Sequence, residues 1–333
     1  MHLRVLATMA VLLAFAAAPD AAAQQHLNPL VDLHAARKAV FGLYAPANPR
    51  GRGGRGRAGA PVSGAPEAPA TPARTPAELA KDAVGYALSD YLFDGGMEGN
   101  FDAGYATFSE YMKGMMAAVP DGQRLRFPFM VKTHRIAEDP ALAAARIGRQ
   151  LNLGVAGIVF VGVESAEEVK AGLAAMRFVS NGGLRPDDDL GDAPAYWGLT
   201  PQQYRARADL WPLNPRGELV NWTIVESREG LAHVREIAAV PGIGALFPGA
   251  GTLRQVFSTT DATGRRVTDE AAWEAAIQQV LAACKEFNVP CGFPANTPEV
   301  MEQRYRQGFR VFVIAWGDNG FRTVEAGRKL AGR

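Results

Sequence analysis

The sequence predicts a closed barrel of eight parallel strands surrounded by helices, the (β/α)8 TIM-barrel fold. Short apolar runs rich in Val, Ile and Phe alternate with amphipathic segments along most of the 333 residues. Eight such repeats occupy about 250 residues, which is the usual length of this barrel. No G-x-G-x-x-G motif follows the first apolar run, so the alternative, a doubly wound open sheet with a dinucleotide site, has less support.

The alternation places each element in order along the chain. Strands are expected at eight apolar runs, which are 40–44, 88–93, 127–132, 156–162, 220–225, 243–248, 290–293 and 309–315. Helices are expected at the amphipathic segments 108–119, 141–151, 166–176, 228–240, 269–287, 298–307 and 324–332. Because parallel strands need crossover connections, this order predicts one ring in a single domain.

The N-terminal segment predicts export. Residues 1–23 combine a short basic start, an apolar stretch and small residues at a cleavage position, which is the pattern of a secretory signal peptide cut after Ala23. The apolar stretch is shorter than the about 20 residues of a membrane span, and an uncleaved membrane anchor is the alternative. We therefore expect a periplasmic or secreted protein that is not associated with a membrane after cleavage.

Two segments interrupt the alternation. We expect residues 24–45 to hold an N-terminal segment and the first strand, 46–76 a flexible insertion rich in Gly, Pro and Arg, and 77–333 the remainder of the barrel. An arginine-rich tract can bind nucleic acid, but the formal net charge of +1 gives no reason to expect that partner. Residues 179–219 form a long insertion with several aromatic residues, which we expect to pack and to be able to cover a site.

Cys284 and Cys291 are the only two cysteines of the chain. Export would permit a disulfide between them. However, Cys284 lies in a predicted helix and Cys291 opens a predicted strand, so their spacing does not establish the geometry that a disulfide requires. We expect two buried free thiols.

Polar side chains follow several predicted strands at the end where such barrels carry their active sites. They are Glu98 after the second strand, Lys132 and His134 at the end of the third, Glu164 after the fourth and Glu226 after the fifth. Lys132 and His134 share one face if the strand continues, and suit carboxylate binding, carbonyl polarisation or proton transfer. Glu164 and Glu226 follow adjacent strands, so we expect their carboxylates to converge.

These residues also have ordinary structural interpretations. Glu164 and Glu226 are each followed by a serine that can cap the next helix, and Lys132 and His134 can be solvated surface residues. The sequence has no Ser-His-Asp, Cys-His, P-loop or C-x-x-C signature, which removes several enzyme classes.

Longer stretches resemble a known family. The segments GIVFVGVESAEEVKAGLAAMRF, VNWTIVESREGLAHVREIAAVPGIGALFPGAGTL and GFRVFVIAWGDNGF, and the acidic loop in ALSDYLFDGGMEGNFD, are similar to the HpcH/HpaI aldolase family. The resemblance runs from about residue 28 to the end, apart from 46–76. It implies a pyruvate/phosphoenolpyruvate-like barrel, assembled as a trimer or hexamer, that cleaves carbon–carbon bonds of small molecules. It also implies a divalent metal ion, Mg²⁺ or Mn²⁺, held by a Glu and an Asp.

The family's functional residues carry over to this sequence only in part. The metal-binding Glu falls on Glu226, whereas its Asp partner falls on Thr252. The Arg that grips the substrate falls on Lys132, which keeps the charge but not the bidentate fork. The acidic residue after the second strand falls near Glu98, but the His beside it is not retained, and His134 is the candidate replacement.

We therefore expect an exported carbon–carbon lyase of aldolase type that acts on a hydroxy-carbonyl or hydroxy-acid substrate with an aromatic or bulky group. A metal-free variant with an imine on Lys132 is open, and a non-catalytic ligand-binding protein on the same barrel is the alternative. Aromatic residues expected near the mouth of the barrel, which is the end where the strands terminate, are Tyr44, Trp197, Phe293 and Trp316. The candidate residues are, for catalysis, Lys132, His134 and Glu98; for substrate binding, Lys132, Gly249, Gly251, Thr252 and Trp316; and for the metal, Glu226 and Glu164.

Overall fold

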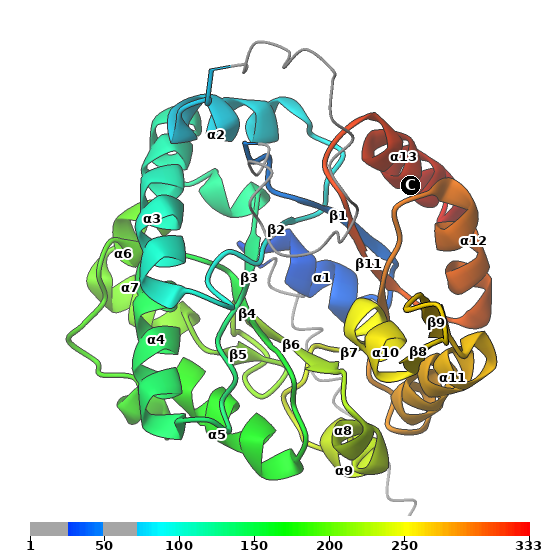
Figure 1. The fold of residues 1–333 in the computed structure, drawn as a ribbon. Coiled ribbons are helices and arrows are strands. Elements are labelled where there is room, and N and C mark those ends of the chain that lie inside the picture. The colour runs from blue at the N-terminus through cyan, green and yellow to red at the C-terminus, as the bar shows by residue number, and fades with distance from the viewer. Residues whose placement is uncertain (1–25, 49–71) are drawn as a thin grey trace, which may run out of the picture.

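The protein forms a closed parallel barrel in a computed structural model that describes residues 26–48 and 72–333. In this part of the chain the strands pair in the order β10-β11-β1-β2-β3-β4-β6-β7, and a bridge between Leu246 and Cys291 joins β7 to β10. Helices surround the ring (Figure 1). The predicted (β/α)8 fold is confirmed. The eight strands are β1 Val40–Tyr44, β2 Leu92–Asp94, β3 Phe129–Lys132, β4 Gly157–Phe160, β6 Leu219–Val225, β7 Ala245–Pro248, β10 Gly292–Pro294 and β11 Val311–Ile314.

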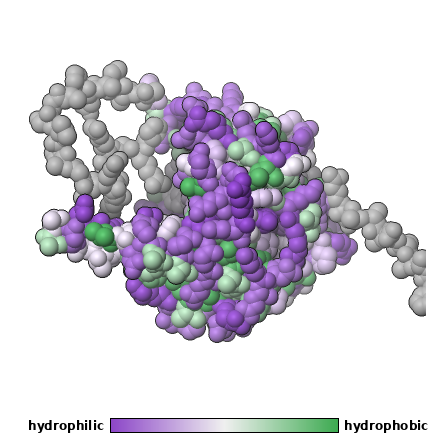
Figure 2. All heavy atoms as spheres, turned by 90° about the vertical axis from the view of Figure 1, so that its right-hand side faces the viewer, coloured by the Kyte–Doolittle hydropathy of each residue, from purple (hydrophilic) through white to green (hydrophobic). Residues whose placement is uncertain are grey.

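Amphipathic helices cover the outside of the ring, and each follows its strand. They are α2 Pro76–Gly85, α3 Phe101–Ala118, α4 Pro140–Asn152, α5 Ala166–Met176, α8 Arg228–Ala232 with α9 Val234–Ala238, α11 Glu270–Glu286, α12 Pro298–Gln307 and α13 Asp318–Leu330. A short helix, α10 Ala250–Val256, and a hairpin of β8 Ser258–Thr260 and β9 Arg266–Thr268 precede α11. The face that carries α12 and α13 is mostly hydrophilic (Figure 2), as expected for helices in contact with water.

Large side chains fill the interior of the barrel. Trp222 is fully buried there, and its ring lies 4.8 Å from that of Tyr91 and 5.2 Å from that of Phe247, between centroids. Tyr91 fits because Gly42 has no side chain: a Cβ at position 42 would lie 2.3 Å from the Tyr91 ring. The Tyr91 hydroxyl donates to the carbonyl of Phe312 at 2.6 Å. The barrel is therefore a packed core, as in other barrels of this class.

The helix α1, Pro29–Ala35, closes the N-terminal end of the barrel, and the sequence analysis did not predict it. Its Leu30 and Val31 are fully buried against the interior side chains. The carboxylate of Glu218, at the start of β6, accepts hydrogen bonds from the backbone N–H groups of Leu27 (3.1 Å) and Asn28 (3.0 Å). These bonds fix the chain at the point where it enters α1.

The long insertion between β4 and β6 lies at the N-terminal end of the barrel. It contains α6 Ala193–Trp197, α7 Pro201–Arg207 and β5 Leu210–Trp211. The Trp197 indole donates to the carbonyl of Gly154 at 2.9 Å, ahead of β4, and β5 pairs with the first residues of β6. The insertion is packed, as expected. The expectation that it covers the mouth is wrong, because a segment between a helix and the next strand lies at the opposite end.

Cys284 and Cys291 form a disulfide, so the expectation of two free thiols is wrong. The turn between α11 and β10 folds back on itself, and the N–H of Val289 donates to the carbonyl of Cys284 at 2.9 Å. This turn brings the two Cα atoms to 5.6 Å, within the usual range for a disulfide.

Several predicted segments lie wholly or partly outside the described residues. The signal peptide at 1–23 and most of the insertion at 46–76 are among them. Helix α2 begins at Pro76, the last residue of that predicted insertion, because Thr75 and Glu78 form a capping box. In the part of the chain that the structure describes, no helix has both the length and the apolar character needed to cross a membrane.

Candidate active site

A cavity of about 280 Å³ opens at the C-terminal ends of the strands, where barrels of this class carry their active sites. Its floor is apolar and aromatic, and includes Phe93, Trp222 and Phe247. Lys132 and Glu226 supply its charged groups. The remaining wall includes Tyr44 and the turn from Pro248 to Thr252. An apolar cavity with a few converging polar groups is the usual form of a small-molecule site.

Glu226 follows β6 in phase with two residues of the cavity floor. Trp222, Ile224 and Glu226 are two apart along the chain, and all three line the cavity. The side chain of Glu226 lies against Gly249, where a Cβ would come within 2.6 Å of the Oε2 atom. With the other described residues, the Glu226 carboxylate makes no hydrogen bond or ion pair. It is therefore available to a ligand.

Lys132, Glu98 and His134, the three predicted catalytic residues, form one cluster. The Lys132 ammonium lies 2.8 Å from the Glu98 carboxylate. The Nδ1 atom of His134 lies 3.0 Å from the backbone carbonyl oxygen of Glu98. Of the three, Lys132 lines the cavity, whereas Glu98 and His134 do not. Gln150 donates to the Lys132 carbonyl at 2.8 Å, which fixes the backbone from which the lysine extends.

His134 has hydrogen-bond acceptors on both sides of its ring. Besides the Glu98 carbonyl at Nδ1, the Glu138 carboxylate lies 2.7 Å from Nε2. A carbonyl and a carboxylate cannot donate, so both partners are acceptors. The strand β3 ends at Lys132, and His134 therefore belongs to the following loop rather than to the same strand face.

Two further predicted site residues, Glu164 and Trp316, also do not line the cavity. The carboxylate of Glu164 pairs with Arg135 at 3.3 Å, and its carbonyl accepts from His233 at 3.0 Å. Glu164 therefore lies outside the lining of the cavity to which Glu226 belongs. Trp316 packs against Phe321, with 5.1 Å between ring centroids, outside the cavity. Gly249, Gly251 and Thr252 do line it.

The other aromatic residues expected near the mouth divide in the same way. Tyr44 lines the cavity, whereas Trp197 lies at the N-terminal end of the barrel and Phe293 packs outward against Phe309 at 5.3 Å. Phe93, Trp222 and Phe247 were not predicted as parts of the site from the sequence. The two-residue period back from Glu226 is a signal that could have found Trp222.

The described residues do not fit a carboxylate-held divalent metal ion. Within them, no three His, Cys, Asp or Glu side chains form a group that could hold one. Thr252 lines the cavity at the position where the family resemblance predicts an Asp. The Glu164 carboxylate already forms an ion pair with Arg135. Mg²⁺ usually keeps several waters and is bound through one or two carboxylates of the protein. Among the described lining residues, Glu226 is the one carboxylate, and Thr252 at the second family position supplies none, so the two-carboxylate set implied by the resemblance is not present.

Comparisons with known proteins place this barrel among the aldolases and lyases. The HpcH/HpaI aldolase/citrate lyase family model matches residues 135–326. The chain is 27% identical over 184 residues to 2-dehydro-3,6-dideoxy-6-sulfogluconate aldolase of Pseudomonas putida, covering 54% of this chain and 63% of the relative. It is 26% identical over 176 residues to hydroxypyruvate/pyruvate aldolase of Paraburkholderia phytofirmans, covering 53% and 64%. The chain thus spans less than two thirds of these curated relatives.

A solved structure extends the likeness in fold beyond those segments. A protein of the same family from Burkholderia cenocepacia J2315 superposes with a TM-score of 0.61 at 20% identity, over 92% of this chain and 98% of that one. With the family match over more than half of the residues, the class is an aldolase/lyase barrel. The chain belongs to the HpcH/HpaI aldolase/citrate lyase family, and the resemblance inferred from the sequence is confirmed.

Proposed function

We propose that the protein is an exported carbon–carbon lyase of aldolase type that acts on an anionic hydroxy-carbonyl substrate without a carboxylate-held metal. The observation that carries this proposal is that one cation, Lys132, and one available carboxylate, Glu226, line the same apolar cavity. Membership of an aldolase/lyase family supports it. The names of both relatives include substrates or products with acidic groups, in agreement with a cationic anchor.

The proposed reaction is a retro-aldol cleavage of a 4-hydroxy-2-oxo acid. The Glu226 carboxylate takes the proton of the C4 hydroxyl, the C3–C4 bond breaks, and its electron pair passes to the 2-oxo group as an enolate. An aldehyde leaves. The proton held by Glu226 returns to C3, which gives a 2-oxo acid and restores the carboxylate. The Lys132 ammonium attracts the substrate carboxylate and the developing enolate charge.

Glu98 and His134 act behind Lys132 in this mechanism. The ion pair with Glu98 orients the lysine chain, because a carboxylate at 2.8 Å attracts the ammonium group. His134 holds the Glu98 backbone from the other side. An imine mechanism would instead use the neutral amine of Lys132 as a nucleophile. Borohydride trapping separates the two possibilities.

The size of the cavity favours a small substrate. A volume of about 280 Å³ is near the lower end of the range for ligand pockets, which is about 300–1,000 Å³. Four aromatic side chains border it: Tyr44, Phe93, Trp222 and Phe247. These walls suit either a short aliphatic chain or one aromatic ring beside the carboxylate.

Turnover tests the proposal directly. The purified protein, incubated with aliphatic and aromatic 4-hydroxy-2-oxo acids, is expected to release a 2-oxo acid, measured by coupling to lactate dehydrogenase or by chromatography. Chelator is expected to leave the rate unchanged. Glu226→Gln removes the base and is expected to lower kcat about a hundredfold, whereas Glu229→Gln, an exposed glutamate on α8, is the matched control.

A non-catalytic binding protein is the second candidate, favoured by Thr252 at the cavity wall in place of an acidic ligand. It predicts saturable binding of 2-oxo acids in calorimetry with no product from any member of the panel. Loss of activity with chelator and recovery with Mg²⁺ or Mn²⁺ would instead contradict the metal-free part of the proposal and leave the lyase part intact.

Export and assembly are separate parts of the proposal. Mass spectrometry of the mature chain, expected to begin after Ala23, and cell fractionation test export to the periplasm or medium. Light scattering after size exclusion tests the trimer or hexamer proposed from the family resemblance. A monomer, or an intact N-terminus in the cytoplasmic fraction, would contradict the respective part.

A further inference from the structure

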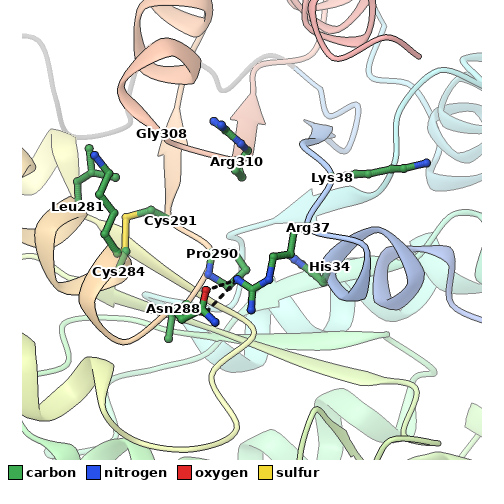
Figure 3. Close-up of a pocket in the computed structure, with 12 residues that line it drawn as sticks. His34, Arg37, Lys38, Leu281, Cys284, Asn288, Pro290, Cys291, Gly308 and Arg310 are labelled. Atoms are coloured by element: carbon green, nitrogen blue, oxygen red, sulfur yellow. Dashed lines mark hydrogen bonds between the residues drawn. A yellow bond between two sulfur atoms is a disulfide. The ribbon is translucent and has the colours of Figure 1, made fainter.

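A second cavity lies at the other end of the barrel, beside the disulfide, and also has a volume of about 280 Å³ (Figure 3). Four cationic side chains line it: Arg37, Lys38, Lys285 and Arg310. None of the described residues that line it is acidic. We call this the basic cavity. Glu286 is adjacent in sequence to Lys285, but its carboxylate pairs with Arg235 at 2.6 Å and does not line the basic cavity.

Among the described residues, no acidic side chain neutralises the positive charges of the basic cavity. Lys38 and Lys285 form no ion pair with another described residue. Within the described part of the chain, the Arg310 side chain donates only to backbone carbonyls, those of Tyr305 at 2.9 Å and Phe309 at 2.8 Å. Uncompensated cations around a concave surface create a positive potential that attracts anions.

The walls of the basic cavity are fixed by unusual local structure. Arg37 and Asn288 both have positive φ, 52° and 59°, and the Arg37 guanidinium donates to the Asn288 carbonyl (3.3 Å) and side chain. In Figure 3 this contact bridges two segments 251 residues apart, while Lys38 extends away from the disulfide. The link between Cys284 and Cys291 holds the turn on the opposite side. Residues in this backbone conformation persist where the surrounding structure holds them, often at binding sites.

A buried histidine completes the wall. His34 is almost fully buried, and burial lowers its pKa to about 4, so the ring is neutral near pH 7. The Trp222 indole can only donate, and it lies 3.3 Å from the Nε2 atom of His34, so Nε2 is the acceptor and Nδ1 carries the proton. Within the described part of the chain the ring makes this one hydrogen bond. His34 lines the basic cavity, and its Nδ1–H makes no hydrogen bond with another described residue.

We propose that the basic cavity is a binding site for a small oxyanion with two or more negative charges, a phosphate or a polycarboxylate. Arg37, Lys285 and Arg310 provide the charge, and His34 provides a neutral donor. Guanidinium and ammonium groups around a small cavity suit tetrahedral phosphate oxygens and clustered carboxylates alike. The site lies at the end of the barrel opposite the catalytic mouth, so it is distinct from the proposed lyase site.

The same histidine connects the basic cavity to tryptophans that can report binding. Trp222 donates to His34 and also lines the mouth cavity, and Trp211 stacks on His34 with 6.0 Å between ring centroids. An anion that bonds to His34 changes the surroundings of both indoles. Tryptophan fluorescence therefore gives a readout that does not depend on enzymatic activity.

The test titrates the full-length mature protein with inorganic phosphate, pyrophosphate and citrate, each against sodium chloride of equal ionic strength. Calorimetry is expected to show one saturable site, accompanied by a change in tryptophan fluorescence. The double variant Arg37→Asn and Lys285→Met is expected to weaken binding at least about tenfold, because each cation supplies a charged hydrogen bond. Asparagine is chosen since it tolerates positive φ.

The matched control is Lys329→Met, an exposed lysine on α13 that does not line the basic cavity, which is expected to bind like the wild type. Tighter binding of phosphate and pyrophosphate assigns a phosphate ligand, and tighter binding of citrate assigns a polycarboxylate. The proposal is overturned if none of the three probes binds saturably. It is equally overturned if the double variant, folded by circular dichroism, binds with the affinity of the control.

Discussion

The two ends of the barrel hold cavities of similar size with opposite chemistry. The mouth has aromatic walls with one cation, Lys132, already paired with Glu98, and one available carboxylate, Glu226. The N-terminal end has four cations and no acidic lining residue among those described. We infer from this difference that the mouth suits proton transfer within a substrate, whereas the other end suits the binding of an anion.

The ends also differ in what holds them together. At the N-terminal end, fully buried Glu218 bonds to the backbone ahead of α1 and to Arg207 at 3.0 Å. Asp90, also buried, pairs with Arg328 at 2.7 Å and accepts from the N–H of Phe41. Charged groups at the mouth have fewer partners. Stability is thus concentrated at one end and reactivity at the other, the usual division in barrels of this class.

The largest expected effect comes from Lys132→Met, which removes the cation of the mouth. We expect kcat/KM for the best substrate of the proposed panel to fall about a hundred- to a thousandfold, because the carboxylate and enolate charges lose their partner. The unfolding midpoint in urea is expected to change little. Lys132→Arg keeps the charge and is expected to retain part of the activity, whereas an imine mechanism predicts that Arg is as inactive as Met. Lys113→Met, in an exposed ion pair with Glu110, is the control.

A substitution at the N-terminal end of the barrel is expected to affect stability rather than activity. Glu218→Ala leaves the hydrogen-bond donors of Leu27, Asn28 and Arg207 without their acceptor. Breaking such a buried pair is expected to lower the free energy of unfolding by about 3 kcal/mol, measured by urea denaturation, while KM is expected to stay close to wild type in the folded fraction. Glu110→Ala, in an exposed pair, is expected to cost about 0.5 kcal/mol or less. Equal losses in the two variants would contradict the anchoring role of Glu218.

The regular elements of the barrel were predictable because local sequence signals mark where each element begins and ends. The expected strand at 40–44 and the expected helices at 166–176 and 298–307 match β1, α5 and α12, and both helices have side-chain caps at Ser165 and Thr297. Helix α1 was missed because seven residues carry too short a pattern. Its position depends on a tertiary contact with Glu218 that no local pattern records.

The site was predictable in its strand-end residues and less so in its contacts. The order of strands brings Lys132 and Glu98 together, and their pairing follows from adjacent β2 and β3. The failure at Glu164 has a specific cause, since Arg135 is three residues beyond β3 and competes for that carboxylate. The wrong expectation that residues 179–219 could cover the site was avoidable. This segment follows a helix and precedes a strand, so it lies at the opposite end of the barrel.

Acid is expected to weaken the N-terminal end through His34. Burial lowers its pKa from 6.5 to about 4, so the unfolded chain takes up a proton between these values while the folded chain does not. The free energy of unfolding therefore decreases as the pH falls from 6.5 to 4, by about 2 to 3 kcal/mol from this residue. His34→Gln, which can accept from Trp222 without titrating, is expected to show a shallower acid loss. Identical pH profiles of the two proteins in urea would contradict this role.

The smallest expected effect tests the close approach of Glu226 to the turn after β7. A Cβ at position 249 would lie 2.3 Å from the Cβ of Glu226 and 2.6 Å from its Oε2 atom, so Gly249→Ala must displace the carboxylate. We expect kcat to fall about tenfold, because a base displaced by a fraction of an ångström meets the hydroxyl at a poorer distance.

The matched substitution is Gly148→Ala on α4, where an added Cβ meets no atom within 4 Å, and it is expected to leave kcat unchanged and to stabilise the helix slightly. If Gly249→Ala retained full activity while Glu226→Gln did not, the base would tolerate displacement. The carboxylate would then act through its charge rather than through a fixed proton-transfer distance. In that respect the mouth would be similar to the basic cavity, where we propose that charge attracts the ligand.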